Sequence, residues 1–328
     1  MITRRGFLRA SMAGGAFVMS PLSALHLVAT SAGPARPSIS APLLEVGPGE
    51  KLITILHTND THSQIDPLPA NDGQYPDMGG VARRATLVKR TRKENPNTLL
   101  IDAGDVFQGT PYFNFYRGEV EYRAMSLIGY DVVTLGNHDF DNGVDALAAA
   151  MKFANFEFVS CNYDVSGTSL EGRVKPYTVR VVGGVRVGLF GMGVSPDNLI
   201  TPANFKGVKY NDPVKAARDV VKTLREIEHC TLVVGMSHLG YYSNPRQGGI
   251  GDSQVAAQVD GIDFIASGHT HTFMKEPVVT KTPSGGSTII FQVGRSGIYV
   301  GRVDFRVRNG KVMASAGRLL DLRDEALA

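Results

Sequence analysis

Cysteine is scarce in this chain of 328 residues, which contains only Cys161 and Cys230. Two cysteines do not make a disulfide framework, so we expect buried free thiols, with a single bridge as the alternative. Beyond its N-terminal segment the chain also lacks any uncharged apolar run of 18 residues, so no membrane-spanning helix is expected there. A hydrophobic content of 43% and a charged content of 20% then indicate a globular protein.

Positive charge is scarcer in the body of the chain than the formal net charge of +3 suggests. Arg4, Arg5, Arg9 and Arg36 are the only charged residues before Glu45, and removing these four leaves a net charge of about −1. The body has no basic stripe, so we expect no nucleic acid polymer as a partner.

The N-terminal segment itself is typical of an export signal. Paired arginines at Arg4 and Arg5 precede Phe7-Leu8, a weakly apolar stretch and a small-residue zone near Ala32. We expect a twin-arginine signal peptide over residues 1–32, with a disordered basic tail or an uncleaved anchor as alternatives. A Pro- and Ser-rich linker follows over residues 33–48. The protein is then expected in the periplasm or otherwise exported, with the membrane involved only in export.

Five short apolar runs in the body are each followed at once by a polar cluster. The runs cover residues 52–57, 98–101, 132–135, 231–235 and 264–266, and the clusters cover residues 60–62, 104–105, 136–139, 237–238 and 268–271. Short apolar runs bounded by glycine and polar residues predict buried strands of an α/β sheet. Because ligands gather outside the carboxyl ends of such strands, the five clusters predict one active site.

The remaining pattern predicts the layers of the fold. Helical periodicity over residues 79–92, 119–128, 144–153 and 213–228 alternates with strands near residues 158 and 185–190. A β-rich end follows over residues 278–280, 288–293, 299–308 and from 311 onward, joined by turns such as Asn309-Gly310. We therefore expect an α/β fold in which two stacked mixed β-sheets are flanked by helices.

The clusters contain seven candidate metal ligands with nitrogen and oxygen donors. These are Asp60, His62, Asp105, Asn137, His238, His269 and His271. The absence of thiolates suits Mn, Fe, Zn or Co rather than a structural zinc site. If one carboxylate bridges, seven residues supply eight bonds, which is about four for each of two metals. Asp105 is the expected bridge, because glycines on either side let its backbone approach a metal closely. The i, i+2 spacing of the two dyads would aim both side chains of each into one pocket.

These residues resemble the calcineurin-like metallophosphoesterases, whose pattern is Asp-x-His, Gly-Asp, Gly-Asn-His-Asp/Glu, His and Gly-His-x-His. The flanking residues 56–62, 102–105, 109–111 and 136–141 are similar to the 5′-nucleotidase branch. The resemblance covers residues 50–310 and implies the four-layer αββα fold of that family.

The resemblance also implies a role for each residue of the site. It implies a first divalent metal on Asp60, His62, Asp105 and His271, and a second on Asp105, Asn137, His238 and His269. His138 would face the substrate phosphate together with Asn137 and protonate the leaving oxygen, with Asp141 as its partner. A metal-activated hydroxide would attack phosphorus in line. The role of Asp139 stays open.

The resemblance has one gap. Relatives in the nucleotidase branch carry a C-terminal specificity domain, whereas residues 49–328 here are expected to form the metallophosphoesterase domain alone. The chain would then be a fragment, half of a split enzyme whose second domain is a separate polypeptide, or a broad phosphomonoesterase. Phe107, Tyr112 and Tyr241 are candidates for stacking a substrate base, although packing is an equally good interpretation.

The sequence therefore predicts an exported two-metal hydrolase of phosphate monoesters, with 5′-nucleotides or nucleotide sugars as substrates. A thiosulfohydrolase-like enzyme of sulfur oxidation is the alternative enzyme. A non-catalytic metal-binding subunit of a split nucleotidase is the alternative without turnover.

Overall fold

The computed structural model describes residues 42–242 and 249–323. The chain divides into Met1–Pro37 and Ser38–Ala328, and all elements described below belong to the second unit. The expected signal peptide and residues 33–41 of the expected linker lie outside the described residues.

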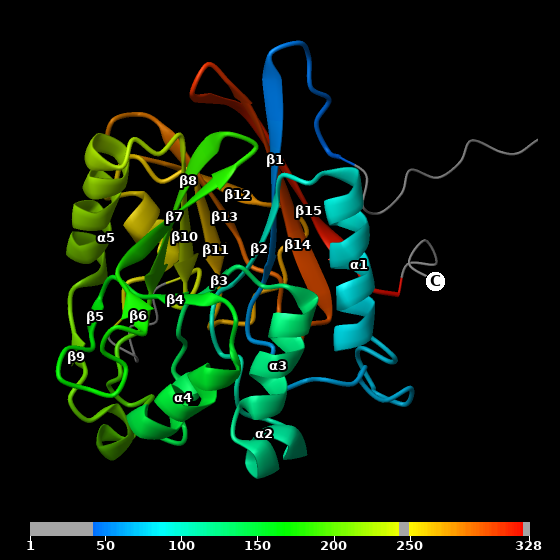
Figure 1. The fold of residues 1–328 in the computed structure, drawn as a ribbon, viewed down its shortest axis with the longest axis vertical. Coiled ribbons are helices and arrows are strands. Elements are labelled where there is room, and N and C mark those ends of the chain that lie inside the picture. The colour runs from blue at the N-terminus through cyan, green and yellow to red at the C-terminus, as the bar shows by residue number, and fades with distance from the viewer. Residues whose placement is uncertain (1–41, 243–248, 324–328) are drawn as a thin grey trace, which may run out of the picture. The chain divides into compact units, whose positions relative to one another are not determined.

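Two mixed sheets form the centre of this unit (Figure 1). The first has the strand order β15-β14-β1-β2-β3-β4-β6 and the second the order β12-β13-β11-β10-β8-β7. The strands of the first sheet are β1 (Glu50–Thr58), β2 (Thr98–Asp102), β3 (Val132–Val133), β4 (Glu157–Val159), β6 (Val174–Lys175), β14 (Tyr299–Arg308) and β15 (Lys311–Asp321). Those of the second are β7 (Tyr177–Val182), β8 (Val185–Met192), β10 (Leu232–Ser237), β11 (Phe264–Ser267), β12 (Val278–Lys281) and β13 (Ser287–Phe291). A small separate pair is formed by β5 (Tyr163–Asp164) and β9 (Lys209–Tyr210).

Parallel strands occupy the middle of both sheets. In the first sheet β1, β2, β3, β4 and β6 run parallel, and β14 and β15 are antiparallel at one side. In the second sheet β8, β10, β11 and β13 run parallel between the antiparallel strands β7 and β12. All five apolar runs that end in polar clusters therefore point their carboxyl ends to one edge of their sheet.

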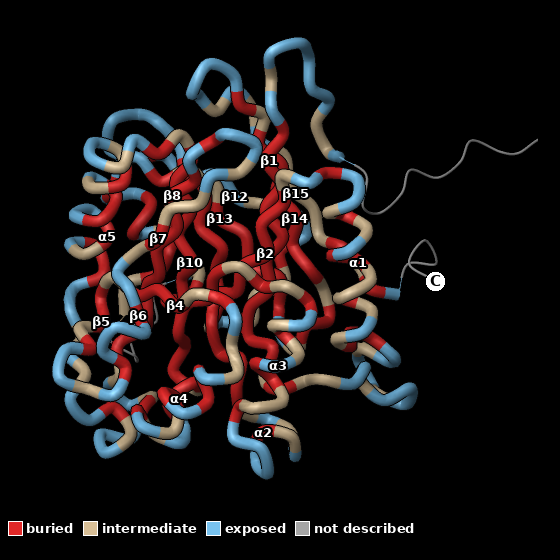
Figure 2. Tube along the Cα trace, viewed as in Figure 1, coloured by how far each residue is buried: buried red, intermediate tan, exposed pale blue. Residues whose placement is uncertain are grey.

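Helices cover the outer faces of the sheets. They are α1 (Val81–Glu94), α2 (Pro111–Tyr116), α3 (Glu119–Ile128), α4 (Val144–Ala150), α5 (Pro213–Lys222) and α6 (Asp252–Ala256). One buried cluster joins α1 and α3 to the first sheet, and another joins α5 and α6 to the second. A third cluster lies between the sheets and includes Ile55 of β1 and Val234 of β10. Figure 2 shows the strands as the buried part of the unit and exposed residues on the helices and loops.

The predicted two-sheet αββα architecture is confirmed. Two helical segments end differently from the expectation: α5 continues as a π-helix over Thr223–Ile227, and α4 as a 3-10 turn over Met151–Phe153. The predicted Asn309-Gly310 turn joins β14 to β15 with both residues at positive φ, as a two-residue hairpin requires. Both cysteines are free thiols. Among the described residues no helix has the length and apolar character needed to cross a membrane.

Candidate active site

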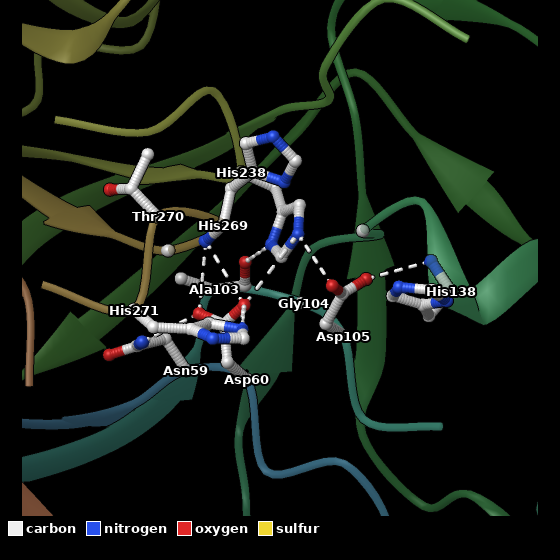
Figure 3. Close-up of polar contacts among 12 residues, drawn as sticks. Asn59, Asp60, Ala103, Gly104, Asp105, His138, His238, His269, Thr270 and His271 are labelled. Atoms are coloured by element: carbon white, nitrogen blue, oxygen red, sulfur yellow. Dashed lines mark hydrogen bonds and ion pairs between the residues drawn. The ribbon is translucent and has the colours of Figure 1, made fainter. Parts of the chain in front are cut away.

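All seven predicted ligands lie just beyond strand ends at the carboxyl edge of the two sheets. Asp60 and His62 follow β1, Asp105 follows β2 and Asn137 follows the short strand β3. The second sheet contributes His238 after β10, and His269 and His271 after β11. Figure 3 shows these segments converging from both sheets.

Asp60, His62 and His271 form the first of two candidate metal clusters. Oδ1 of Asp60 lies 3.2 Å from Nε2 of His271 and 3.9 Å from Nε2 of His62. The two histidine Nε2 atoms are 2.9 Å apart. Three ligand atoms at such distances can hold one cation.

Asp105, His238 and His269 form the second cluster. Nε2 of His238 lies 3.0 Å from Oδ2 of Asp105 and 3.9 Å from Oδ1 of Asp60, so this histidine faces both clusters. The backbone amide of His269 donates to the Asp60 carboxylate at 2.9 Å. The two clusters therefore adjoin, and Asp60 of the first contacts His238 and His269 of the second.

A left-handed backbone carries most of these ligands. Asp60, His62, Asp105, His269 and His271 have φ between 46° and 72°, which side-chain-bearing residues rarely adopt. Such strain persists where the surrounding structure enforces it, typically at functional sites. The i, i+2 dyads thus converge through turns and not along an extended strand.

Backbone carbonyls orient two of the histidine rings. Nδ1 of His238 donates to the carbonyl of Ala103 at 2.7 Å, and Nδ1 of His62 to that of Phe107 at 3.2 Å. In both cases Nε2 is left to face the clusters. A partner on the far nitrogen is the usual arrangement for a metal-binding histidine.

The residues fit divalent cations. Asn137 is 4% exposed, and its Oδ1 has no hydrogen-bond partner among residues 42–242 and 249–323. A buried amide oxygen without a partner is costly, and a cation would satisfy it. Together with imidazole and carboxylate groups it makes the nitrogen and oxygen donor set of Mn, Fe, Zn or Co sites.

The charges of the second cluster are strongly coupled. Burial lowers the pKa of His238, but Asp105 and then Asp60 outweigh this and raise it to about 10. Burial conversely raises the pKa of Asp105, while His238 holds it well below its usual range. Burial, followed by the His238 charge, lowers the pKa of His269 to about 4. The carboxylates that favour a proton on His238 would equally favour a cation there, and a metal ligand must be deprotonated.

His138 and Asp141 stand together beside the clusters. Nδ1 of His138 lies 3.0 Å from Oδ2 of Asp141, and this hydrogen bond raises the pKa of His138. The His138 side chain is 30% exposed, so a substrate can reach it. Its backbone amide donates to Oδ1 of Asp105 at 2.8 Å, which ties this pair to the second cluster (Figure 3).

The three aromatic candidates differ in burial. The Phe107 ring is 2% exposed and packs on Phe113 and Tyr122, so the structure corrects its predicted role as a substrate contact. Its contribution is the backbone carbonyl that orients His62. Tyr112 is half-buried and donates to Asp66, and Tyr241 packs against Tyr242.

The sequence interpretation missed the role of Asn59. Its side chain donates to Oδ2 of Asp60 and to the carbonyl of Gly294, both at 2.6 Å (Figure 3). Its adjacency to Asp60 was the only signal in the sequence. Asp139, whose role the sequence left open, is 2% exposed, and its carboxylate accepts a hydrogen bond from the backbone amide of Asp105.

Residues 53–273 match the family described as "Calcineurin-like phosphoesterase", so the chain belongs to this family, as predicted. The curated relatives include 5′-nucleotidase of Rattus norvegicus, 32% identical over 288 residues, with 81% of this chain and 48% of the relative covered. Snake venom 5′-nucleotidase of Gloydius brevicauda is 30% identical over 296 residues, with coverages of 84% and 48%. A solved 5′-nucleotidase precursor from Thermus thermophilus has 35% identity and a TM-score of 0.76, with 84% of this chain and 55% of that chain covered. The chain spans about half the length of the curated relatives it matches.

Proposed function

We propose that this chain hydrolyses phosphate ester bonds, with 5′-nucleotides, which are monoesters, or nucleotide sugars, which contain a diphosphate linkage, as substrates. The observation that carries the proposal is the pairing of two adjoining metal clusters with a separate, accessible His138–Asp141 pair. The similarity to proteins named 5′-nucleotidase supports the substrate class.

The ligand residues are proposed to divide between two divalent cations. Asp60, His62 and His271 would hold the first, and Asn137, His238 and His269 the second, with Asp105 between them. Bound there, such cations neutralise charge on phosphoryl oxygens and make water a better nucleophile. The protein holds these side chains in fixed positions. The left-handed turns restrict the backbone, and the hydrogen bonds from Nδ1 of His238 and His62 to backbone carbonyls restrict the rings.

His138 is proposed to protonate the leaving oxygen. Asp141 accepts from Nδ1, so Nε2 is the atom left to face a substrate. A donor must keep its proton at the working pH, and the hydrogen bond to Asp141 favours the protonated ring.

The test is phosphate release by the purified full chain loaded with Mn²⁺ or Zn²⁺. The substrates are AMP and a chromogenic monoester, which release phosphate directly, and UDP-glucose, whose hydrolysis is followed as UMP and glucose 1-phosphate. His138→Ala is expected to keep its metals and lose about 2–4 kcal/mol of transition-state stabilisation. An unchanged rate would remove His138 from the mechanism. A metal-loaded chain that is inert on every ester would contradict the proposal and favour a metal-binding subunit, and turnover of a thiosulfonate alone would favour the sulfur-oxidation alternative.

The pH profile tests Asp141 separately. Because Asp141 raises the pKa of His138, activity that needs the protonated ring is lost as the pH rises through that pKa. Asp141→Asn is expected to move this alkaline limb to lower pH while metal content stays unchanged. A limb that does not move would mean that another group sets it.

Export by the twin-arginine pathway is proposed from the paired arginines alone. Replacing Arg4 and Arg5 with lysine should abolish export of the full chain while its intracellular activity persists. Unchanged export of the double variant would contradict this pathway.

A further inference from the structure

The carboxylate of Asp139 is a buried acceptor for backbone amides of two separate turns. The amides of Asp105 and Val106 donate to it at 3.1 Å, and that of Phe107 at 3.3 Å. The amide of Gly136 donates at 2.8 Å. Four backbone amides that donate to one buried side chain tie the two turns to each other.

The turn after β2 is shaped to surround this carboxylate. Gly104 has φ 88° and Asp105 φ 55°, and the three amides that follow Gly104 are consecutive. Successive amides next to a left-handed residue form a concave anion site. Here the anion is a side chain of the same protein, so the site serves the fold and not a ligand.

The turn after β3 packs against the first turn at backbone contact. A Cβ atom on Gly136 would lie 2.2 Å from Oδ1 and 2.5 Å from the amide nitrogen of Asp105. No side chain fits at this position, and the two turns have no slack between them. Asp139 therefore joins two turns whose backbones touch at Gly136 and leave no room there for a side chain.

We call Asp139 with the four amides that donate to it the Asp139 clamp. Candidate ligands of the second metal lie on both of the turns that this clamp joins. Asp105 gives up its backbone amide to Asp139 while its carboxylate faces His238 and the amide of His138 (Figure 3). Asn137 lies between Gly136, which is bound to the clamp, and His138. We propose that Asp139 is the positioning residue that sets the spacing of Asp105 and Asn137, and through it the affinity of the second metal. This inference rests on the proposed metal-dependent function.

The chain contains a matched control at the other end of the same two strands. Asp131 precedes β3, and its carboxylate accepts the backbone amide of Leu100 in β2 at 2.8 Å and pairs with Arg92. It joins the same strands through a backbone amide but lies away from the ligands. Loss of either clamp should destabilise the fold, whereas only Asp139 should affect the metals.

The experiment compares Asp139→Asn, Asp139→Glu and Asp131→Asn in the full chain. Mn²⁺ affinity by titration and magnetic coupling of the Mn²⁺ pair by EPR are the decisive measurements, with unfolding midpoints alongside. Asp139→Asn is expected to lose about tenfold or more in affinity for one of the two metals and to lose the coupling. Asp139→Glu keeps the acceptor and should stay within about threefold of wild type, as should Asp131→Asn.

Equal losses in Asp139→Asn and Asp139→Glu, or wild-type affinity and coupling in Asp139→Asn, would overturn the inference. If Asp139→Asn does not fold, Asp139→Ser replaces it, because serine puts no amide donor against the four amides and the same loss is expected. Wild-type protein that binds two coupled metals without hydrolysing any ester would contradict the proposed function and leave this inference standing. Wild-type protein that binds no metal would contradict both.

Discussion

Two fully buried histidines show how different two regions of this molecule are. His57 lies in β1 between the sheets, and His238 lies just after β10 at the carboxyl edge; both are 0% exposed. The pKa of His57 is lowered to about 3, whereas that of His238 is raised to about 10. Residue type and burial are the same, so the surroundings make the difference.

The interior between the sheets offers His57 no polar partner. Its ring makes T-shaped contacts with Phe264 and Phe291, with ring centroids 5.4 and 5.3 Å apart. Neither ring nitrogen is hydrogen-bonded to a described residue. Burial alone therefore lowers its pKa. The carboxyl edge instead places Asp105 and Asp60 against His238, and these charges outweigh the same burial cost. The difference between a packing histidine and a candidate metal ligand thus has a physical cause, which is the presence of neighbouring carboxylates.

Exchanging each histidine for leucine should give the largest contrast. In chelator at neutral pH, His238→Leu is expected to lose about 3–5 kcal/mol of unfolding free energy, because it leaves buried carboxylates without their charge partner. His57→Leu is expected to change it by less than about 1.5 kcal/mol. Denaturant unfolding measures both, and equal losses would show that the two environments do not differ as described.

Metal removal should sharpen the same contrast. A cation at 100 times its dissociation constant stabilises the folded state by about 2.7 kcal/mol per site. On adding Mn²⁺, the unfolding free energy of His57→Leu should rise as much as that of wild type. That of His238→Leu should rise only by the contribution of the first cluster. A full metal-dependent gain in His238→Leu would exclude it as a ligand.

The pH dependence of stability should give the smallest of these effects. Because the folded pKa of His57 lies near 3 and its ordinary value is 6.5, the unfolded chain takes up a proton that the folded chain refuses. Stability is therefore lost as the pH falls below 6.5, by about 2 kcal/mol at pH 5 from this group. Relative to wild type, His57→Leu should therefore become more stable by this amount between pH 8 and pH 5, and a pH-independent difference would contradict the lowered pKa.

Several features of the site could not be read from local sequence. The candidate ligand residues were visible because each follows a short apolar run, and parallel strands bring such positions to one edge. The burial of the Phe107 ring was not visible, because an aromatic residue near a site packs inward or outward according to neighbours from other elements. The clamp by Asp139 joins turns more than thirty residues apart in sequence, so no local pattern announces it.

Local sequence specifies the strand–cluster pattern, the donor chemistry of the candidate site and membership of the phosphoesterase family. These properties depend on residue type and spacing, which are the same whether the chain is folded or unfolded. Long-range contacts set the left-handed backbone of five candidate ligands, the four amides bound to Asp139 and the different pKa values of His57 and His238. Those properties come from groups distant in sequence that burial brings within a few ångströms, where charge and hydrogen bonding act most strongly.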